Sequence, residues 1–469
     1  MKKGQVYEGT IESVEFPNKG RIYLPEEDRW VVVKNGVPGQ KVRFSVNKIR
    51  KGKAEGRLLE VLEPSASEIP SACPHFGQCG GCTYQNLPYE EQLAMKNEQV
   101  KKMMDEAVDG EYIWEGIKPS PVRTEYRNKM EFSFGDEYKD GPLALGMHKR
   151  GSFHDIVNVT DCQIVDEDYR KILACTLECA GESGLPYYHR MRHVGYFRHL
   201  LVRKAVKTGE ILVDLVTASD TAELGVDPAE AMKKIQTFKA AWLEKMTAMN
   251  FDGTLVGILH TKNDSLADVV KDEGTEVLFG QDYFYEELLE LKFKITPFSF
   301  FQTNSLGAEV LYETAREYIG DTNEKVVFDL YSGTGTIAQI LAPVAKKVVG
   351  VEIVEEAVEA AKENAKLNNL NNCEFLAGDV AEIIKTVKDK PDIIILDPPR
   401  SGVHPKALEY VIKFNAKEII YVSCNPKTLV ENLRDLIGAG YKVVQSTVKD
   451  MFPNTPHAEV VVKLVLKDR

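Results

Sequence analysis

Short apolar runs alternate with helix-length amphipathic segments over residues 297–469. The runs have the length and β-branched content of strands that are covered on both faces, which read as continuous hydrophobic stretches. They are Val326–Leu330, Val348–Val351, Cys373–Leu376, Ile393–Leu396, Ile419–Val422, Lys442–Val448 and Glu459–Leu466. The alternation predicts a C-terminal doubly wound α/β domain of Rossmann-like type over 297–469.

Two of these predicted strands end in clusters of reactive or polar residues. Asp397-Pro398-Pro399-Arg400 follows one, and Ser423-Cys424-Asn425-Pro426 follows the next. Ligands of open α/β sheets bind beyond the carboxyl ends of the strands, so Asp397 and Cys424 are expected to face one crevice. A cysteine at a strand end is more often inert packing, but the motifs around Cys424 favour a functional thiol.

A glycine-rich turn, Tyr331 to Thr336, follows the first strand of this domain and contains Gly333 and Gly335. Glu352 ends the second strand, at the spacing where a carboxylate reaches ribose hydroxyls. The turn alone also fits a dinucleotide fingerprint. The Asp-Pro-Pro motif after the fourth strand instead favours S-adenosylmethionine, and Arg400, in place of an aromatic residue, argues against methylation of an exocyclic amine.

The N-terminal residues 4–62 alternate apolar and polar positions in five short runs separated by turn formers. This pattern predicts a small β-barrel of OB type over 1–62. Residues 1–60 hold 13 Lys and Arg against 8 Asp and Glu, in a chain of net charge −12. Such segregation indicates a basic, nucleic-acid-binding module on an acidic enzyme, with chance fluctuation as the alternative. Its candidate phosphate-binding residues are Lys48, Arg50, Lys51 and Lys53.

Three cysteines lie within ten residues, at Cys73, Cys79 and Cys82. A fourth ligand must come from elsewhere, and Cys162 is the best candidate. One compact triplet with a distant fourth cysteine is typical of a [4Fe–4S] cluster. Zinc sites usually supply paired CxxC units, so zinc is the second candidate. The C-x5-C-x2-C spacing differs from the radical-SAM triplet.

Residues 63–296 contain a helical pattern followed by strand-like runs, which predicts a central α+β domain with a mostly antiparallel sheet. Its candidate RNA-binding residues are Arg127, Lys129 and Arg198, for which solvated strand-edge charge is an equally good interpretation. No apolar stretch is long enough for a membrane span. The N-terminus lacks the apolar core of a signal peptide, so we expect a cytoplasmic protein, monomeric and without an obligate protein partner.

Five motifs together identify a family: FFQTN at 300–304, DLYSGTGT at 329–336, DPPRSG at 397–402, VSCNP at 422–426 and HAE at 457–459. In this order they closely resemble the RNA uracil-5-methyltransferases, and most of all the TRAM-bearing, iron–sulfur 23S rRNA branch. The resemblance implies that Cys424 is the nucleophile and Glu459 the general base. It also implies that Gln302, Tyr331, Glu352 and Asp397 hold S-adenosylmethionine, and that Cys73, Cys79, Cys82 and Cys162 ligate the cluster.

The chemistry of these residue types agrees with that function. C5 of uracil is too weak a nucleophile to take a methyl group until a thiolate adds to C6. A carboxylate is then adequate to remove the C5 proton. We therefore expect methylation of a flipped-out uridine in 23S rRNA, with tRNA as the alternative substrate. An iron–sulfur redox enzyme with a dinucleotide cofactor would leave DPPR, SCNP and Glu459 unexplained. A catalytically silent RNA-binding protein would not need every catalytic position filled.

Overall fold

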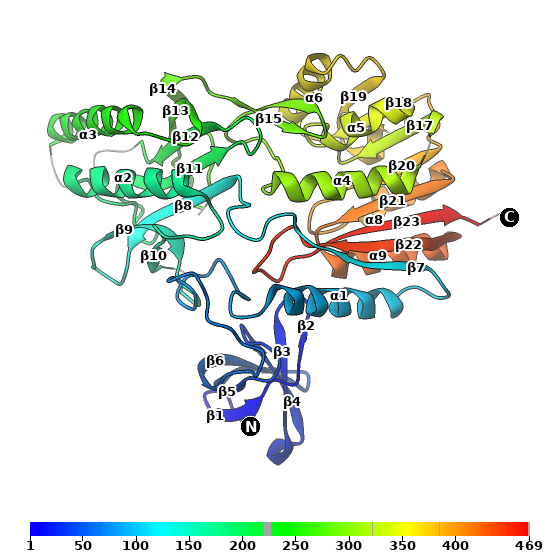
Figure 1. The fold of residues 1–469 in the computed structure, drawn as a ribbon, viewed down its shortest axis with the longest axis horizontal. Helices are drawn as coiled ribbons and strands as arrows, with labels where there is room; N and C mark the ends of the chain where they lie inside the picture. Colours follow the sequence, from blue (N-terminus) through cyan, green and yellow to red (C-terminus); the bar gives the residue numbers. More distant parts are fainter. Residues whose placement is uncertain (153, 220–226, 268, 321, 384, 468–469) are drawn as a thin grey trace.

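The computed structural model describes residues 1–469 except 153, 220–226, 268, 321, 384 and 468–469. Figure 1 shows a small N-terminal β-unit below two larger units that lie side by side, one built around α2 and α3 and the other containing the C-terminal sheet. Among the described residues, no helix has both the length and the apolar character needed to cross a membrane.

The N-terminal unit is one curled sheet with the strand order β1-β5-β6-β4-β3-β2. Alternate residues of its strands point into a core that includes Ile22, Val31 and Phe44, so the predicted barrel is present as a half-barrel. Lys51 and Gly52 connect β5 and β6 with positive φ angles of 48° and 77°, as in a type I′ hairpin turn. The strands are β1 (Val6–Thr10), β2 (Ser13–Glu15), β3 (Lys19–Leu24), β4 (Arg29–Lys34), β5 (Lys41–Arg50) and β6 (Lys53–Glu63).

The central unit contains a sheet with the strand order β10-β9-β8-β11-β12-β13-β14. Each neighbouring pair is antiparallel except β12 and β13, as the sequence pattern predicts. Helices α2 (Glu167–Ser183) and α3 (Pro228–Ala248) pack on one face, where Trp242 is fully buried. The strands are β8 (Lys129–Asp136), β9 (Leu143–His148), β10 (Ile156–Asn158), β11 (Phe197–Lys204), β12 (Glu210–Thr217), β13 (Thr254–Lys262) and β14 (Thr275–Gly280).

A hairpin of β15 (Phe284–Leu288) and β16 (Leu291–Ile295) leads into the C-terminal sheet, whose strand order is β19-β18-β17-β20-β21-β23-β22-β7. Neighbouring strands from β19 to β21 are parallel, whereas β23 is antiparallel to β21 and β22. The strands are β7 (Ile113–Lys118), β17 (Thr322–Leu330), β18 (Ala345–Glu352), β19 (Cys373–Ala377), β20 (Ile393–Leu396), β21 (Glu418–Ser423), β22 (Tyr441–Lys449) and β23 (Glu459–Leu466).

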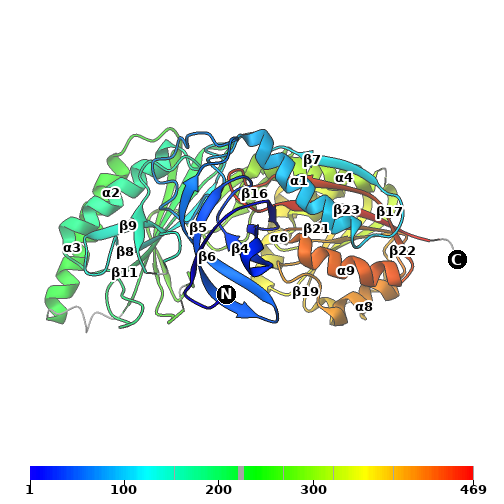
Figure 2. The same ribbon diagram turned by 90° about the horizontal axis from the view of Figure 1, so that it is seen from below.

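Helices cover both faces of this sheet and pack against it to form one hydrophobic core on each face. One face packs against α4 (Ser305–Ile319), α5 (Thr336–Leu341) and α6 (Glu355–Leu367). The other packs against α1 (Tyr89–Asp105), the short α7 (Val380–Ile383), α8 (Pro405–Phe414) and α9 (Pro426–Gly438), and Figure 2 shows α1, α8 and α9 on that side. The strands are therefore buried on both faces, which explains their continuous apolar runs.

The segment 89–118 joins the C-terminal sheet, although it lies within the residues 63–296 expected in the central domain. Strand β7 pairs in parallel with β22, with Ile113 opposite Gln445, and α1 packs beside α9. Part of the expected central segment thus belongs to the C-terminal sheet. An edge strand has the same local pattern in either sheet, so the sequence pattern could not predict that β7 joins the C-terminal sheet.

Candidate active site

The strand register brings the acidic motif residues to one edge of the C-terminal sheet. Leu330 at the end of β17 lies opposite Val351 of β18 and Leu396 of β20. Tyr331, Glu352 and Asp397 come directly after these residues. The carboxyl ends of parallel strands meet at one edge, so all three lie at the edge of the sheet where ligands of such sheets bind in a crevice.

Cys424 and Glu459 are brought together by the antiparallel pairing of β21 and β23. Ser423, the last residue of β21, pairs with Val460, so Cys424, which follows Ser423, and Glu459, which precedes Val460, lie at the same end of this strand pair. Glu459 is only 5% exposed. A thiol and a buried carboxyl from segments far apart in the sequence are therefore neighbours at the crevice.

The two motif loops are also tied directly to each other. Asn425 caps α9 by accepting a bond from the Lys427 N–H, and its Nδ2 donates to the Arg400 carbonyl at 2.9 Å. Asn432 on α9 accepts from the Val403 N–H at 2.9 Å and from the Tyr421 hydroxyl at 2.7 Å. These bonds fix the loop after β20 against the loop that carries Cys424. Sequence reasoning did not select Asn432, because a polar residue within a helix gives no local signal of such a role.

The glycine-rich turn has left-handed backbone at Tyr331, Gly333 and Gly335, with φ of 69°, 54° and 73°. A Cβ atom at Gly335 would lie 2.6 Å from the Phe375 ring, so glycine is required there for close packing as well as for its φ. Glu352 anchors the turn, because its Oε2 accepts from the Gly333 N–H at 3.0 Å. Its Oε1 accepts from the Ile353 and Val354 N–H groups at 2.9 and 3.0 Å, so about one of the four acceptor positions of the carboxylate, on Oε2, is left for a ligand hydroxyl.

Asp329 lies beneath this turn and is completely buried. Its Oδ2 accepts from the Ala338 N–H at 3.0 Å, whereas its Oδ1 has no hydrogen-bond partner among the described residues. Burial raises the pKa of Asp329 well above its usual value, and the nearby Asp397 and Glu352 add to the rise.

Burial raises the pKa values of the acids gathered at this edge of the sheet. Burial raises the pKa of Asp397 to about 7. The pKa of Glu459 is raised well above its usual value, by burial first and by Asp397 second. Burial, Glu459 and Asp397 raise the pKa of the Cys424 thiol to about 11, and Arg400 opposes this rise. A cationic ligand would favour the ionised form of all three groups.

The FFQTN segment joins the central unit to this crevice. Asn128 donates to the Gln302 carbonyl at 2.9 Å, and Asn304 caps α4 by accepting from the Gly307 N–H at 2.9 Å. The side chain of Gln302 donates to the hydroxyl of Tyr312 on α4, which also lies near Asp397. Sequence reasoning did not select Tyr312, which follows the ordinary pattern of an amphipathic helix.

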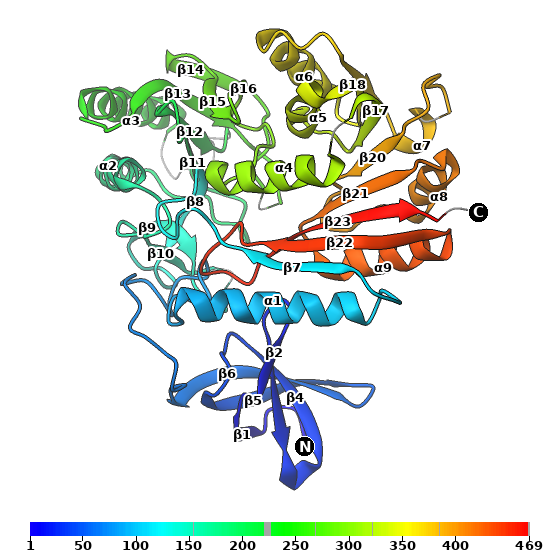
Figure 3. The ribbon, with the colours of Figure 1, turned by 45° about the vertical axis from the view of Figure 1, so that its right-hand side comes forward.

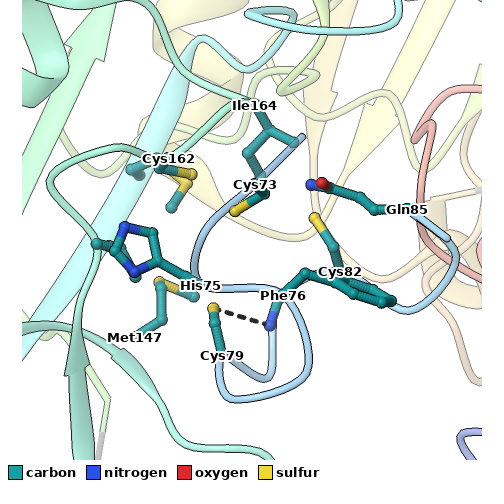
Figure 4. A pocket seen from close by; sticks show the side chains of 12 residues that line it. Cys73, His75, Phe76, Cys79, Cys82, Gln85, Met147, Cys162 and Ile164 are labelled. Carbon is teal, nitrogen blue, oxygen red and sulfur yellow. Dashed lines mark hydrogen bonds between the residues drawn. The ribbon is translucent and has the colours of Figure 1, made fainter. Parts of the chain in front are cut away.

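A second site lies in the central unit, where all four predicted cluster cysteines line one cavity (Figure 4). Cys73, Cys79 and Cys82 come from the loop before α1, and Cys162 comes from the loop after β10. The Gly81 N–H donates to the Cys79 Sγ at 3.3 Å. Burial raises the pKa of Cys82 to about 12 and that of Cys162 to about 11, with smaller contributions from the neighbouring thiols. Within the described part of the chain, no three His, Cys, Asp or Glu side chains are arranged to hold a metal ion.

The basic residues of the hairpin between β5 and β6 are accessible, since Lys48, Arg50, Lys51 and Lys53 are all exposed. In the central unit, the Arg127 Nε donates to the Lys129 carbonyl at 3.0 Å, and the Lys129 Nζ lies 2.9 Å from Glu131.

Arg198 does not fit the predicted RNA-binding role. It is 5% exposed, and its guanidinium donates to the carbonyls of Asn263, Ser265 and Ala267. It stacks over the ring of Tyr188. The prediction was wrong because an arginine in a strand pattern looks the same in sequence whether its charge meets solvent or backbone carbonyls.

Comparison with known proteins gives consistent matches. Residues 253–467 match the family model described as tRNA (Uracil-5-)-methyltransferase. An uncharacterized RNA methyltransferase of Clostridium tetani is 54% identical over 469 residues, covering 100% of this chain and 99% of that protein. One from Caldanaerobacter subterraneus subsp. tengcongensis is 48% identical, covering 98% and 99%.

Among solved structures, the chain is similar to the Pyrococcus abyssi tRNA (uracil-54, C5)-methyltransferase in complex with S-adenosyl-L-homocysteine. The TM-score is 0.73 at 26% identity, covering 98% of this chain and 100% of that chain. The full-length match extends the likeness to the N-terminal half-barrel and the central unit. The chain thus belongs to the RNA uracil-5-methyltransferase family and is an S-adenosylmethionine-dependent RNA (uracil-5-)-methyltransferase.

Proposed function

We propose that the protein methylates C5 of a uridine in 23S rRNA through a covalent bond between Cys424 and C6 of the base. The observation that supports this proposal is the antiparallel pairing of Ser423 with Val460, because it brings their chain neighbours Cys424 and Glu459 to the same edge of the sheet. It supplies a nucleophile and a base at the same edge of the sheet as the glycine-rich turn. A target stacked in folded RNA would have to be flipped out to reach them.

The proposed reaction assigns a distinct step to each of these two groups. The Cys424 thiol gives its proton to water and Sγ bonds to C6, so the electrons of the C5–C6 double bond move into an enolate. C5 then takes the methyl group from the sulfonium sulfur, which is left as a neutral thioether. Glu459, as a carboxylate, accepts the C5 proton, the C5–C6 double bond re-forms, and the Cys424 Sγ leaves C6 as a thiolate. Proton exchange with water then returns Glu459 to its carboxylate and Cys424 to its thiol.

We assign cofactor binding to the residues around the turn: Gln302, Tyr331, Gly333, Gly335, Glu352 and Asp397. The buried acids of the crevice support this assignment, because a sulfonium is a cation and favours neighbouring carboxylates in their ionised form. Glu352 lies where a strand-end carboxylate meets the ribose hydroxyls of a bound nucleoside.

We assign a [4Fe–4S] cluster to Cys73, Cys79, Cys82 and Cys162. Four thiols from two segments around one cavity are the right donor set. Each thiolate of such a cluster bonds to a different iron, so its ligands stand farther apart than around one zinc ion. One compact triplet with a distant fourth cysteine favours the cluster over zinc, whose sites usually supply paired CxxC units. Methyl transfer requires no electron, so we assign these residues the structural role of fixing the 73–82 loop to the central sheet.

We assign RNA binding to the exposed Lys48, Arg50, Lys51 and Lys53 of the half-barrel and to Arg127 and Lys129. A basic hairpin tip can reach backbone phosphates without base specificity. Transfer RNA is the second candidate substrate, because the similar Pyrococcus abyssi enzyme is named for it and matches this chain over its whole length.

Mapping of 5-methyluridine in rRNA and tRNA from a strain that lacks the gene tests the substrate. We expect a specific 5-methyluridine to disappear from 23S rRNA and to return when the wild-type gene is restored. Loss from tRNA alone would establish the second candidate instead. Unchanged 5-methyluridine in both RNA classes would contradict the proposal.

A further inference from the structure

The loop between β22 and β23, residues 450–458, leads directly to Glu459. Figure 3 shows this loop extending beyond the end of the sheet, between α1 and the central unit. It is built from Asp450, Met451, Phe452, Pro453, Asn454, Thr455, Pro456, His457 and Ala458. The contacts that hold this loop therefore also act on the backbone that leads into Glu459, the first residue of β23.

A buried ion pair joins helix α1 to the start of the loop. The Lys96 Nζ lies 2.7 Å from the Asp450 Oδ1, and these side chains are 1% and 0% exposed. Lys96 also donates to the Phe452 carbonyl at 3.1 Å. The Tyr89 hydroxyl, from the first turn of α1, donates to the Asp450 Oδ2 at 2.8 Å. The contacts from Tyr89 and Lys96 thus fix both the side chain of Asp450 and the backbone of Phe452.

Gln92, one turn before Lys96 on α1, holds the middle of the loop. Its Nε2 donates to the Asn454 Oδ1 at 3.1 Å, and its Oε1 accepts from the Asn454 N–H at 2.9 Å. Asn454 has left-handed backbone, with φ of 67°. The N–H groups of Thr83 and Tyr84, directly after Cys82, donate to its carbonyl at 2.7 and 3.0 Å. The turn at Asn454 is therefore held by α1 and by the cysteine loop at once.

Two further side chains, from outside α1 and the cysteine loop, donate hydrogen bonds to carbonyls of the loop 450–458. Asn304 donates to the Met451 carbonyl at 2.8 Å, and the Tyr126 hydroxyl donates to the Pro453 carbonyl at 3.0 Å. Four successive carbonyls, from 451 to 454, accept bonds from outside the loop. Surface loops usually leave such groups to water, so this loop is positioned as firmly as an element of the sheet.

We propose that Gln92 and Lys96 are positioning residues for Glu459, and that they govern removal of the C5 proton more than methyl transfer itself. The inference rests on the roles proposed above for Cys424 and Glu459. Cys424 lies between β21 and the cap of α9, whereas Glu459 is the first residue of β23 and is joined directly to the loop that α1 holds. A shift of roughly 1 Å in a catalytic group can cost about a hundredfold in rate, so a relaxed loop affects the base first.

A Gln92→Ala variant tests the inference in single-turnover reactions with labelled S-adenosylmethionine and RNA substrate. One measurement follows transfer of label to RNA, and the other follows release of RNA from the covalent complex on a denaturing gel. We expect methyl transfer within about twofold of wild type and release slowed at least about tenfold, so that the methylated covalent complex accumulates. Glu98→Ala, at an exposed position of the same helix, is the matched control and should release RNA at the wild-type rate.

Equal slowing of both steps, or no accumulation in a folded variant, would overturn the inference. A second variant, Lys96→Met with Asp450→Asn, removes both charges together, because loss of Lys96 alone would leave a buried carboxylate unpaired. It should give the same selective accumulation, and it decides the outcome if Gln92→Ala does not fold. Wild-type protein with 5-fluorouridine RNA separates the two hypotheses. If wild type forms no covalent complex, the proposed role of Cys424 fails. If it does and neither variant accumulates one, only the positioning role fails.

Discussion

The catalytic crevice and the cysteine cavity both gather acids whose pKa burial raises, but they are built in different ways. The crevice takes Asp397, Cys424 and Glu459 from the ends of three neighbouring strands, so sheet hydrogen bonds fix their spacing. The cavity takes three of its four cysteines from the 73–82 loop, which contributes no helix or named strand.

This difference indicates that the two sites differ in how far their structure depends on the ligands proposed for them. Strand register positions the crevice groups before any ligand binds. The cysteine loop is held by turn bonds, such as Cys79 N–H to the His75 carbonyl, and by bonds to the end of β9, such as Gly80 N–H to the His148 carbonyl, rather than by the regular ladder of a sheet. We therefore expect the crevice to keep its shape without cofactor and the cysteine loop to depend on its metal.

Removal of the crevice thiol is the most severe test of this contrast. Cys424→Ala should lower methyl transfer by at least about a thousandfold and abolish the covalent complex with 5-fluorouridine RNA, because no other group can add to C6. The variant should keep its iron content and bind S-adenosylmethionine, since Cys424 lies apart from the cysteine cavity. Radiolabel transfer, gel analysis and metal analysis measure these properties. Near-normal activity would contradict the proposed nucleophile.

Replacement of the base should separate the two halves of the reaction. Glu459→Gln keeps the size of the side chain but cannot accept the C5 proton, so release of methylated RNA should slow by about 10²–10⁴-fold. The methylated covalent complex should then persist on a denaturing gel. Normal release of product RNA would show that another group removes the proton.

The cysteine cavity should respond in the opposite way. Cys82→Ser should lose iron and the brown colour expected of anaerobically purified wild-type protein, and should unfold more easily, because the 73–82 loop loses its metal. Cys175→Ser, a buried cysteine on α2 outside the cavity, is the control and should keep its iron. Iron analysis and thermal unfolding give the result. A colourless wild-type protein that contains zinc would overturn the cluster assignment.

The smallest predicted effect concerns the pH dependence of cofactor binding. The pKa of Asp397 is raised to about 7, so its carboxyl is mostly protonated at pH 6 and mostly ionised at pH 8. A cationic ligand binds the ionised form better, so the Kd for S-adenosylmethionine should fall as pH rises from 6 to 7, by at most about tenfold, and level off above. S-adenosylhomocysteine lacks the sulfonium charge and should show a weaker trend. Calorimetry on wild type and Asp397→Asn measures both, and an unchanged slope in the variant would exclude Asp397.

The proposed catalytic groups could be selected from sequence because each directly follows or begins a strand with a clear apolar pattern. Asp397 and Cys424 come after buried runs, and Glu459 begins the last one. Carboxyl ends of parallel strands share an edge, so local patterns were enough to predict that Asp397 and Cys424 lie together, whereas Glu459 reaches the same edge because β23 runs antiparallel to β21. The proximity of Cys162 to the other three cysteines also follows the prediction, while its role as a ligand remains a prediction.

Other features depend on contacts between segments far apart in the chain. Nothing local marks β7 as a strand of the C-terminal sheet, or Arg198 as a buried donor to backbone carbonyls. Lys96 and Gln92 look like ordinary polar residues of a surface helix, yet both are buried against the loop before Glu459.

Residue type and short-range periodicity were sufficient to predict the order of the motifs, the proposed reacting groups and the strand ends that carry them. The way in which these groups are held depends on the folded chain, because a buried ion pair or a reciprocal amide contact joins residues separated by more than 350 positions. Such pairs leave no pattern in either segment alone, so the position of the Glu459 carboxyl became apparent only in the folded chain.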